Sequence, residues 1–383
     1  MDIINEKKLI SILKSSKNVL LIEPPYTRKY IPLGLAKISS FVKSHCGKTT
    51  YSRGPITGNF DLICIATMFT NDSKIVLQTI KECKADWFLK DVKIIVGGIF
   101  SSLMPEYIYK QTGVSIFTGY SKTLDSCLPD YSINYGVDSF FKNAMTLFTT
   151  RGCINKCPYC MVWRMEPNYH ICSNWQKNIE NIDREICVVS DNSFLSAPHS
   201  HIENVINCLN KNNKKVIFNN GMNCREINDE NAKLFESLKY IRFGFRIGFD
   251  RIEDDGHYQN AMEKLIKAGL KIKGHSYTYI LFNFDDTPQE AYYRAQEAWK
   301  YGSNPYLMRY RPLNQLTRKS TFIGKYWTKN LIRAFSNYGQ NYGYNRGDKT
   351  FESWVNGRTN VDEKLKYKLK LTNDDWDKWN YRR

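Results

Sequence analysis

The sequence predicts an α/β protein: a Rossmann-like, doubly wound domain, then a partial (β/α)6 barrel of the TIM type, then a basic, aromatic-rich tail. Short apolar runs alternate with segments of helical apolar spacing over most of the 383 residues, and such alternation indicates parallel sheets. Prolines or glycines close several of the runs, as at Pro24–Pro25 and Gly97–Gly98. A chain of this length suggests two domains with extensions.

The first predicted domain spans residues 1–140 and ends in a linker. Buried parallel strands are expected in the apolar runs 19–25, 61–66 and 92–98. Helical spacing of apolar residues predicts helices over 33–42 and 73–83. Ligands bind at the carboxyl ends of strands in such sheets, and residues 67–70 and 97–98 fall there.

The predicted barrel spans residues 141–315, and a predicted C-terminal extension spans residues 316–383. Barrel strands are expected in the β-rich runs 145–150, 186–192, 241–246, 277–282 and 305–310, and a further strand with its exit loop is expected over 216–225. Thr287, Pro288 and Glu290 form the pattern of a helix start, with Thr287 as the N-cap. Active sites of barrels lie on loops at the carboxyl ends of the strands, so site residues are expected there.

The most informative motif is a C-x3-C-x2-C cluster formed by Cys153, Cys157 and Cys160. Three thiolates within eight residues can hold three corners of a four-iron cluster. The fourth iron then has no protein ligand, and an open metal position is where a substrate or cofactor binds. A structural zinc site is the alternative, because His170 or Cys172 could supply a fourth ligand.

This cysteine spacing, with Tyr159 directly before the third cysteine and a predicted strand directly before the loop, resembles the signature of radical S-adenosylmethionine (radical SAM) enzymes. The resemblance implies a [4Fe–4S] cluster on the three cysteines and S-adenosylmethionine at the open iron. It also implies a reducing electron donor such as flavodoxin or ferredoxin. Reductive cleavage then gives a 5′-deoxyadenosyl radical that takes hydrogen from a substrate, while the protein binds and orients the reactants.

The same resemblance implies further cofactor-binding residues. Tyr159 matches an aromatic residue near the adenine, with packing over the cluster as an equal alternative. Asp191 and Asn192, at the end of the second predicted barrel strand, stand where the family binds the methionine amino group; capping a turn is the competing role of Asp191. Arg225 follows Gly221 in a Gly-x-x-x-Arg pattern and could pair with a carboxylate or, equally, with a surface acid. The sequence selects no catalytic residue.

Residues 19–130 resemble, weakly, the cobalamin-binding-type domain that precedes the barrel in some radical SAM enzymes. The strand that ends in Pro24–Pro25 and the Gly97–Gly98 pair carry that resemblance. The Asp-x-His-x-x-Gly pattern that supplies a histidine to cobalt is missing, so we expect a degenerate domain and keep bound cobalamin as an alternative. The stretch Pro129–Asp130–Tyr131 is similar to stretches that precede the cysteine motif in uncharacterised bacterial and phage members of the family.

The charge of the chain favours an acidic partner. The formal net charge is +17, which suits nucleic acid or a phosphorylated cofactor. Residues 316–383 carry 15 Lys and Arg against 7 Asp and Glu, with 13 aromatic residues among them. Such a tail could grip a nucleic-acid backbone and stack bases. Packing of the aromatic residues over the barrel, with the lysines in solvent, is the favoured alternative.

A nucleotide or nucleic acid is therefore the preferred substrate of the expected radical SAM enzyme. A peptide substrate and a cobalamin-dependent methyl transfer are alternatives within the same chemistry. A non-catalytic, zinc-stabilised nucleic-acid-binding protein is the alternative from a different class.

The distribution of cysteines predicts a reducing compartment. All eleven lie between Cys46 and Cys224, which argues against a secreted disulfide scaffold. The first 18 residues have the wrong polarity for a signal peptide, and no apolar run reaches the roughly 18 residues that a membrane span needs. A cytoplasmic protein with no membrane partner is expected.

Overall fold

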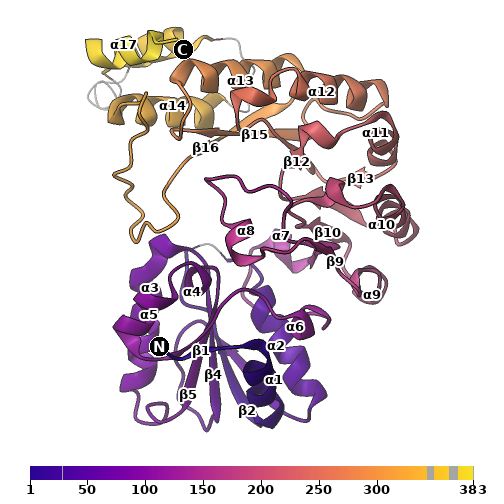
Figure 1. Ribbon diagram of the computed structural model, residues 1–383, viewed down its shortest axis with the longest axis vertical. Coiled ribbons are helices and arrows are strands. Elements are labelled where there is room, and N and C mark those ends of the chain that lie inside the picture. The colour runs from indigo at the N-terminus through magenta and orange to yellow at the C-terminus, as the bar shows by residue number, and fades with distance from the viewer. Residues whose placement is uncertain (28, 343–348, 362–369, 383) are drawn as a thin grey trace. The chain divides into compact units, whose positions relative to one another are not determined.

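The structure is a computed structural model that describes residues 1–27, 29–342, 349–361 and 370–382 (Figure 1). Contacts divide the chain into two compact units. The first unit comprises Met1–Arg184 and Pro312–Ser320, and the second comprises Glu185–Arg311 and Thr321–Arg383. These compact units divide the chain at other points than the domain boundaries predicted after residues 140 and 315. The predicted domains stay a prediction.

A six-stranded parallel sheet forms the centre of the first unit. Its strands lie in the order β1 (Ile3–Ile4), β6 (Ser115–Phe117), β5 (Lys93–Gly98), β4 (Leu62–Thr67), β2 (Asn18–Ile22) and β3 (Lys48–Ser52). The predicted parallel arrangement is confirmed. From β2 the chain continues to β3 on one side and then to β4 on the other, so the order of the strands reverses between β2 and β4. In open α/β sheets such a reversal opens a crevice for ligands.

Helices cover both faces of this sheet. They are α1 (Glu6–Ser15), α2 (Leu33–Ser44), α3 (Ser73–Ala85), α4 (Ile99–Leu103), α5 (Pro105–Thr112) and α6 (Lys122–Asp125), with the short turn η1 (Thr70–Asp72) before α3. Successive residues of β2 alternate between two buried clusters: Leu20 packs with Ile80 of α3, whereas Leu21 packs with Leu35 of α2. A strand buried on both faces has no polar side, which is why it was predicted from a continuous apolar run.

The rest of the first unit leads into and out of the cysteine loop. Its elements are α7 (Ser139–Lys142), β7 (Ala144–Leu147), β8 (Thr150–Arg151), α8 (Val162–Met165), β9 (His170–Ile171) and α9 (Trp175–Asn181). The segment Pro312–Ser320 returns to this unit. There Ser73 Oγ donates a hydrogen bond of 2.9 Å to the Leu316 carbonyl, and Arg318 Nε lies 2.8 Å from Asp72 Oδ1.

Two sets of parallel strands form the second unit. The first set is β13 (Lys239–Tyr240), β11 (Lys215–Phe218) and β10 (Ile186–Val189), and the second is β12 (Met222–Asn223), β14 (Phe245–Gly248), β15 (Ser276–Phe282) and β16 (Asn304–Arg309). The helices between them are η2 (Phe194–Ser196), α10 (His199–Lys211), η3 (Cys224–Glu226), α11 (Asp229–Glu236), η4 (Ile252–Asp254), α12 (His257–Lys267) and α13 (Pro288–Lys300). The predicted strand–helix alternation is confirmed.

The start of α13 is as predicted. Thr287 accepts a hydrogen bond from the Glu290 amide, and Glu290 accepts one from the Thr287 amide, which completes a capping box with Pro288 at the first helical position.

The predicted strand 241–246 was wrong in position. Residues 241–244 form a turn, and β14 begins at Phe245. Phe243 adopts a left-handed backbone with φ of +57°, and a Cβ at Gly244 would lie 2.5 Å from the Val216 carbonyl. The stretch 216–225, which the sequence predicted as a strand with its exit loop, contains β11 and β12. Aromatic residues gave 241–246 a β-like composition, but a close approach of two backbones decides the conformation there.

The C-terminal helices pack on the second unit through an aromatic cluster. They are α14 (Lys329–Tyr342), α15 (Phe351–Val361) and α17 (Asn373–Asn380). Their buried members include Phe335, Trp354 and Trp379, which pack with Phe282 of β15 and Tyr292 of α13. The favoured alternative for the tail, aromatic packing, is confirmed for these side chains, which are therefore not available to stack bases.

Candidate functional site

The cysteine motif lies on a loop of the first unit between β8 and α8. The antiparallel pairing of β8 with β9, in which Arg151 lies opposite His170, holds the start of the loop. Gly152 adopts φ of +75°, and a Cβ there would lie 2.6 Å from the Asn168 carbonyl oxygen. Only glycine suits this combination of backbone angle and close approach.

Backbone hydrogen bonds shape the loop and reach two of its sulfurs. The Cys160 amide donates to the Cys157 carbonyl over 3.0 Å, and the Trp163 indole donates to the same carbonyl over 2.9 Å. The Asn155 amide lies 3.4 Å from Cys153 Sγ, and the Val162 amide lies 3.5 Å from Cys160 Sγ. Amide donors of this kind stabilise thiolates and tune the reduction potential of iron–sulfur clusters.

The donor set on this loop fits a four-iron cluster. Three thiols share an eight-residue loop, and all three side chains are partly exposed, so an external group can reach them. Within the described ranges no three His, Cys, Asp or Glu side chains are gathered to hold a metal ion. The fit therefore rests on the chemistry of the donors, because thiolates are the ligands of iron–sulfur clusters.

A buried ionic network braces Arg151, the last residue of β8, directly before the loop. Arg151 donates to both carboxylate oxygens of Asp125 over 2.6 and 2.9 Å, and its other terminal nitrogen lies 3.2 Å from Glu166. Glu166 in turn accepts from the Gly152 amide over 2.9 Å. Lys37 of α2 lies 2.5 Å from Asp125. The network therefore joins α2 and α6, beside the first sheet, to the backbone directly before Cys153.

The network also sets the charge of its central acid. Burial acts to raise the pKa of Asp125, but hydrogen bonds and charge from Arg151, followed by the charge of Lys37, outweigh it and hold this pKa well below its usual range. Asp125 is therefore a carboxylate with two buried cationic partners. Arg151 also lies over the Phe148 ring, 3.6 Å from its centroid, which covers one face of the guanidinium.

The predicted residues around the cofactor are divided between the two units. Tyr159 is partly exposed on the cysteine loop of the first unit. Asp191 and Asn192 follow β10 in the second unit after one intervening residue, Ser190, and Asp191 is buried. Asn192 Oδ1 accepts a hydrogen bond of 2.9 Å from Asn220, which links the loops after β10 and β11. These two residues thus lie at carboxyl ends of strands, as the sequence predicted.

Arg225 lies in η3 and pairs with Asp254, with Nε 2.6 Å from the carboxylate. The Arg225 side chain is 44% exposed, so the surface ion pair that the sequence left as an equal alternative is the arrangement in this structure. Its role toward a cofactor carboxylate stays a prediction.

Sequence reasoning did not select a polar cluster that the structure brings together in the second unit. Arg246 of β14 donates to the Tyr279 hydroxyl over 2.5 Å and to Asn219 Oδ1 over 3.0 Å, and Tyr279 donates to the Asn219 carbonyl over 2.8 Å. A Cβ at Gly221 would lie 2.9 Å from the Tyr279 ring. The signal in the sequence was Gly221, whose small size is what lets Tyr279 approach.

Asp250, two residues after the end of β14, is a second polar residue that the sequence analysis did not select. Its Oδ1 accepts a hydrogen bond of 2.9 Å from the Leu281 amide. Burial raises its pKa to about 6 despite the nearby charge of Arg294. A carboxyl group with such a pKa can hold or release a proton near neutral pH.

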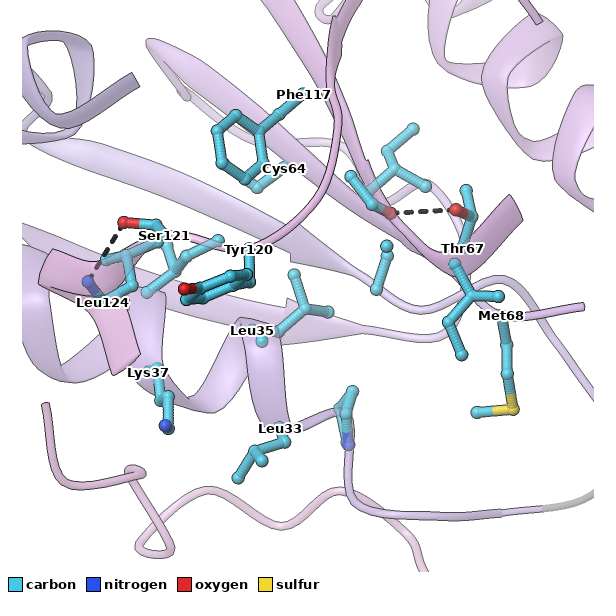
Figure 2. A pocket seen from close by; sticks show the side chains of 18 of the residues that line it. Leu33, Leu35, Lys37, Cys64, Thr67, Met68, Phe117, Tyr120, Ser121 and Leu124 are labelled. Carbon is cyan, nitrogen blue, oxygen red and sulfur yellow. Dashed lines mark hydrogen bonds between the residues drawn. The ribbon is translucent and has the colours of Figure 1, made fainter. Parts of the chain in front are cut away.

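The first unit also contains a cavity of about 320 Å³. Its lining side chains come from α2 (Leu33, Leu35, Lys37), from β4 and the residue after it (Cys64, Thr67, Met68), and from the stretch between the end of β6 and α6 (Phe117, Tyr120, Ser121, Leu124) (Figure 2). Most of the lining is apolar, and it includes Glu23 and Met68, which directly follow β2 and β4, the two strands between which the strand order reverses. This is where open α/β sheets bind ligands.

Comparisons with known proteins support the fold. No family model and no curated protein sequence matches the chain. Among solved structures, the chain is similar to the radical S-adenosylmethionine methyltransferase TsrM from Kitasatospora setae, solved with tryptophan substrate and the S-adenosylmethionine analogue aza-SAM bound. The TM-score is 0.59 at 12% sequence identity, and the match covers 79% of this chain and 75% of that chain. The mixed α/β fold with parallel sheets is therefore similar to that of a radical SAM enzyme.

Helix lengths and hydropathy give no candidate for a membrane span in the part of the chain that the structure describes.

Proposed function

We propose that this chain is a radical SAM enzyme that holds a [4Fe–4S] cluster on Cys153, Cys157 and Cys160. The observation that carries the proposal is the cysteine loop itself: three thiols in a C-x3-C-x2-C spacing, two of them accepting backbone amides, in a chain whose fold is similar to that of a radical SAM methyltransferase. When bound, the cluster supplies the electron that cleaves S-adenosylmethionine to a 5′-deoxyadenosyl radical.

The residues of the chain have separate tasks in this proposal. The three cysteines hold the cluster, and the network of Arg151, Asp125 and Glu166 fixes the backbone from which they extend. Asp191 accepts a hydrogen bond from the ammonium group of S-adenosylmethionine, and Tyr159 lies against its adenine. Flavodoxin or ferredoxin supplies the electron. The setting is cytoplasmic, since reduced thiols are needed to bind the cluster.

A nucleotide or nucleic acid remains the substrate class that we propose, and the charge of +17 supports it. A peptide substrate is the alternative. Because Trp327, Trp354 and Trp379 are buried in the aromatic cluster, the preference for nucleic acid rests on the net charge of the chain.

Cobalamin-dependent methyl transfer is the second candidate function. The fold likeness to a methyltransferase and the cavity at the carboxyl edge of the first sheet favour it. The residues argue against a conventional cobalamin site, because the histidine pattern for cobalt is missing. A product assay decides between the two: 5′-deoxyadenosine indicates radical cleavage alone, and S-adenosylhomocysteine indicates methyl transfer.

The test of the main proposal combines metal analysis with variants. Anaerobically purified protein is expected to contain about four iron and four sulfide per chain and to release 5′-deoxyadenosine from S-adenosylmethionine under reduction. Cys157→Ala is expected to lose both the cluster and this cleavage.

The matched control is Cys172→Ala, which removes a thiol 12 residues from Cys160 in sequence. A three-cysteine cluster retains its iron in that variant. If the protein instead contains one zinc per chain and loses it in both variants, the zinc-stabilised alternative is correct and the enzyme proposal is wrong.

A further inference from the structure

The sheet of β12, β14, β15 and β16 carries aromatic and cationic side chains on the face opposite to α12. Side chains alternate between the two faces of a strand. Thr278 of β15 is buried, and its hydroxyl lies 2.7 Å from the Tyr258 hydroxyl of α12. Tyr277 and Tyr279, on either side of Thr278, are partly exposed and therefore belong to the opposite face.

The register of the strands brings two more side chains to this face. Arg246 of β14 is the register partner of Tyr277, and Tyr306 of β16 is that of Tyr279. The centroid of the Tyr306 ring lies 5.7 Å from that of Tyr277 and 5.6 Å from that of Tyr279. The guanidinium carbon of Arg246 lies 5.8 Å from the centroids of the Tyr277 and Tyr279 rings. We call these four side chains the tyrosine face; Tyr306, which is 46% exposed, offers its ring for stacking.

Arg246 brings a positive charge to the tyrosine face that the protein does not neutralise. Its Nη1 donates to the Tyr279 hydroxyl and to Asn219 Oδ1, and its Nε donates to the Phe243 carbonyl over 3.4 Å. These acceptors are neutral, and Arg246 forms no ion pair within the described residues. The two anchored nitrogens fix the guanidinium, while Nη2, which donates to none of the described residues, can bind an external acceptor.

A flat ring joined to an anion is the ligand that these features fit. Stacking on an aromatic side chain suits any nucleobase, because every base has a π-face. A guanidinium binds phosphate oxygens through charge-assisted hydrogen bonds. An aromatic amino acid also combines a ring with an anion, but its ammonium group shares a carbon atom with its carboxylate. That ammonium group would lie beside the Arg246 cation, and like charges at such a distance repel. A nucleotide brings no second cation.

We propose that the tyrosine face binds a free nucleoside monophosphate, with the base stacked on Tyr306 and the phosphate held by Arg246. Tyr277 and Tyr279 are positioning residues: both rings contact Tyr306, and the Tyr279 hydroxyl holds the guanidinium. That this nucleotide is the substrate rests on the proposed function, whose nucleotide class is thereby narrowed and given binding residues.

The test measures binding of adenosine 5′-monophosphate (AMP), adenosine and ribose 5-phosphate to the anaerobically purified full chain, by equilibrium dialysis at one fixed salt concentration. Adenosine lacks the phosphate, and ribose 5-phosphate lacks the base. AMP is therefore expected to bind about tenfold more tightly than either of them, since each loses one of the two contacts.

Two variants separate the contact with the phosphate from the contact with the base. In Arg246→Gln the affinity for AMP is expected to fall to that for adenosine, while the affinity for adenosine stays unchanged. A merely structural effect of this substitution would weaken adenosine as well. In Tyr306→Ala both AMP and adenosine are expected to bind about tenfold more weakly, whereas Tyr306→Phe keeps the ring and retains the binding.

Exposed residues of the same types give the matched controls. Arg333→Gln changes an exposed arginine of α14, and Tyr293→Ala changes a tyrosine of α13 that is 37% exposed. Both variants should bind AMP like the unmodified chain.

Equal affinity of the unmodified chain for AMP and adenosine would overturn the proposal, and so would unchanged binding of AMP in Tyr306→Ala. Tighter binding of tryptophan than of AMP would overturn it in favour of an aromatic amino acid. Tighter binding of a ten-residue oligoadenylate than of AMP would overturn it in favour of nucleic acid. Displacement of AMP by S-adenosylmethionine, with equal weakening of both in Tyr306→Ala, would assign the tyrosine face to the cofactor.

Iron, sulfide and 5′-deoxyadenosine, measured on the same preparation, test the proposed function separately. If they are found and AMP does not bind, the nucleotide site is wrong and the radical SAM proposal stands. If AMP binds as expected and no iron is found, the nucleotide site stands and its role in radical SAM catalysis is wrong.

Discussion

Arg151 fixes the start of the cysteine loop through buried charge. Its side chain and that of Asp125 are each only 12% exposed, and the side chain of Lys37 is 9% exposed. Asp125→Asn leaves both cations buried with a neutral amide between them. We expect it to lower the free energy of unfolding of the first unit by about 3–5 kcal/mol, as loss of one partner of a buried ion pair does. Urea unfolding of the variant measures this loss.

The control for this change is Glu185→Gln, which removes the partner of Lys215 from a surface pair in which both side chains are more than half exposed. Surface pairs of this kind contribute at most about 1 kcal/mol. Equal effects of Asp125→Asn and Glu185→Gln would show that the brace does not hold the loop.

Burial of Asp250 should make the free energy of unfolding depend on pH, with a sign opposite to that of an ion-paired acid. Its pKa in the folded chain is raised to about 6 by burial, whereas an unfolded aspartate ionises near pH 4. The unfolded chain therefore releases this proton first, and stability falls as the pH rises from about 4 to 6, by on the order of 2–3 kcal/mol. Asp250→Asn keeps an oxygen for the Leu281 amide and is expected to remove that fall, as urea unfolding at a series of pH values would measure.

The exposed acid Asp229 gives the matched control. Asp229→Asn should retain the pH dependence of the unmodified chain. A stability of Asp250→Asn that still falls between pH 4 and 6 would assign the effect to other groups.

Local signals explain why some site residues could be predicted from the sequence. The cysteine spacing and the Thr287 capping box each lie within a few residues, so their geometry follows from the local backbone. The brace could not be predicted in this way. Asp125 lies 26 residues before Arg151 in the chain, and only the packing of α6 beside β8 brings them together.

At the scale of elements, the tail helices stabilise the second unit through aromatic packing. Trp379 of α17 is fully buried against Phe351, with ring centroids 4.1 Å apart, and its indole donates to Glu352 over 2.6 Å. Trp379→Ala is expected to lower the free energy of unfolding by about 3–5 kcal/mol, because the cavity left by a buried tryptophan is filled only in part. Urea unfolding of the second unit measures the loss.

Trp87 provides the comparison, since 76% of it is exposed. Trp87→Ala should change stability by about 1 kcal/mol or less. A similarly small effect of Trp379→Ala would mean that α17 contributes little to the packed core.

Helices and strands could be predicted where the pattern of apolar residues fits one kind of element. Continuous apolar runs located β2, β4 and β5, because both faces of these strands are buried. The same reasoning misplaced β14, because aromatic residues near Phe243 suggested a strand while a left-handed residue and the tight approach at Gly244 impose a turn. The approach involves Val216, which is 28 residues away in sequence, so no local pattern reports it.

At the scale of the whole molecule, the sheet and the cavity follow from one topological fact. The chain crosses from β3 back past β2 to β4, so the connections on the two sides of β2 diverge and leave a space at the carboxyl edge. The alternation of strands and helices predicted the location of this space. The contacts of the buried Glu23 could not be predicted, because its partners Tyr51 and Arg53 lie 28 and 30 residues further along the chain.

The return segment 312–320 makes the first unit depend on residues far along the chain. Leu316 packs on the core beside α3, and its carbonyl accepts from Ser73, while Arg318 pairs with the buried Asp72. Leu316→Asp places a charge on this apolar contact and removes roughly 1.5 kcal/mol of the stabilisation that the buried leucine side chain provides. The segment should then open more often, so that trypsin cleaves after Arg318 and Lys319 about tenfold faster, as timed digestion followed by mass spectrometry would show.

Ile323→Asp, three residues beyond the segment and 44% exposed, is the control and should leave the rate of cleavage nearly unchanged. If Leu316→Asp and the unmodified chain are cleaved at the same rate, the segment is held by its two ends and not by its contacts. Faster cleavage by trypsin in Leu316→Asp, but not in Ile323→Asp, would show that the apolar contact of Leu316 helps to hold the segment, together with the contacts to Ser73 and Asp72. The compact first unit would then include a part of the chain that comes after β16, which the order of predicted elements gave no reason to expect.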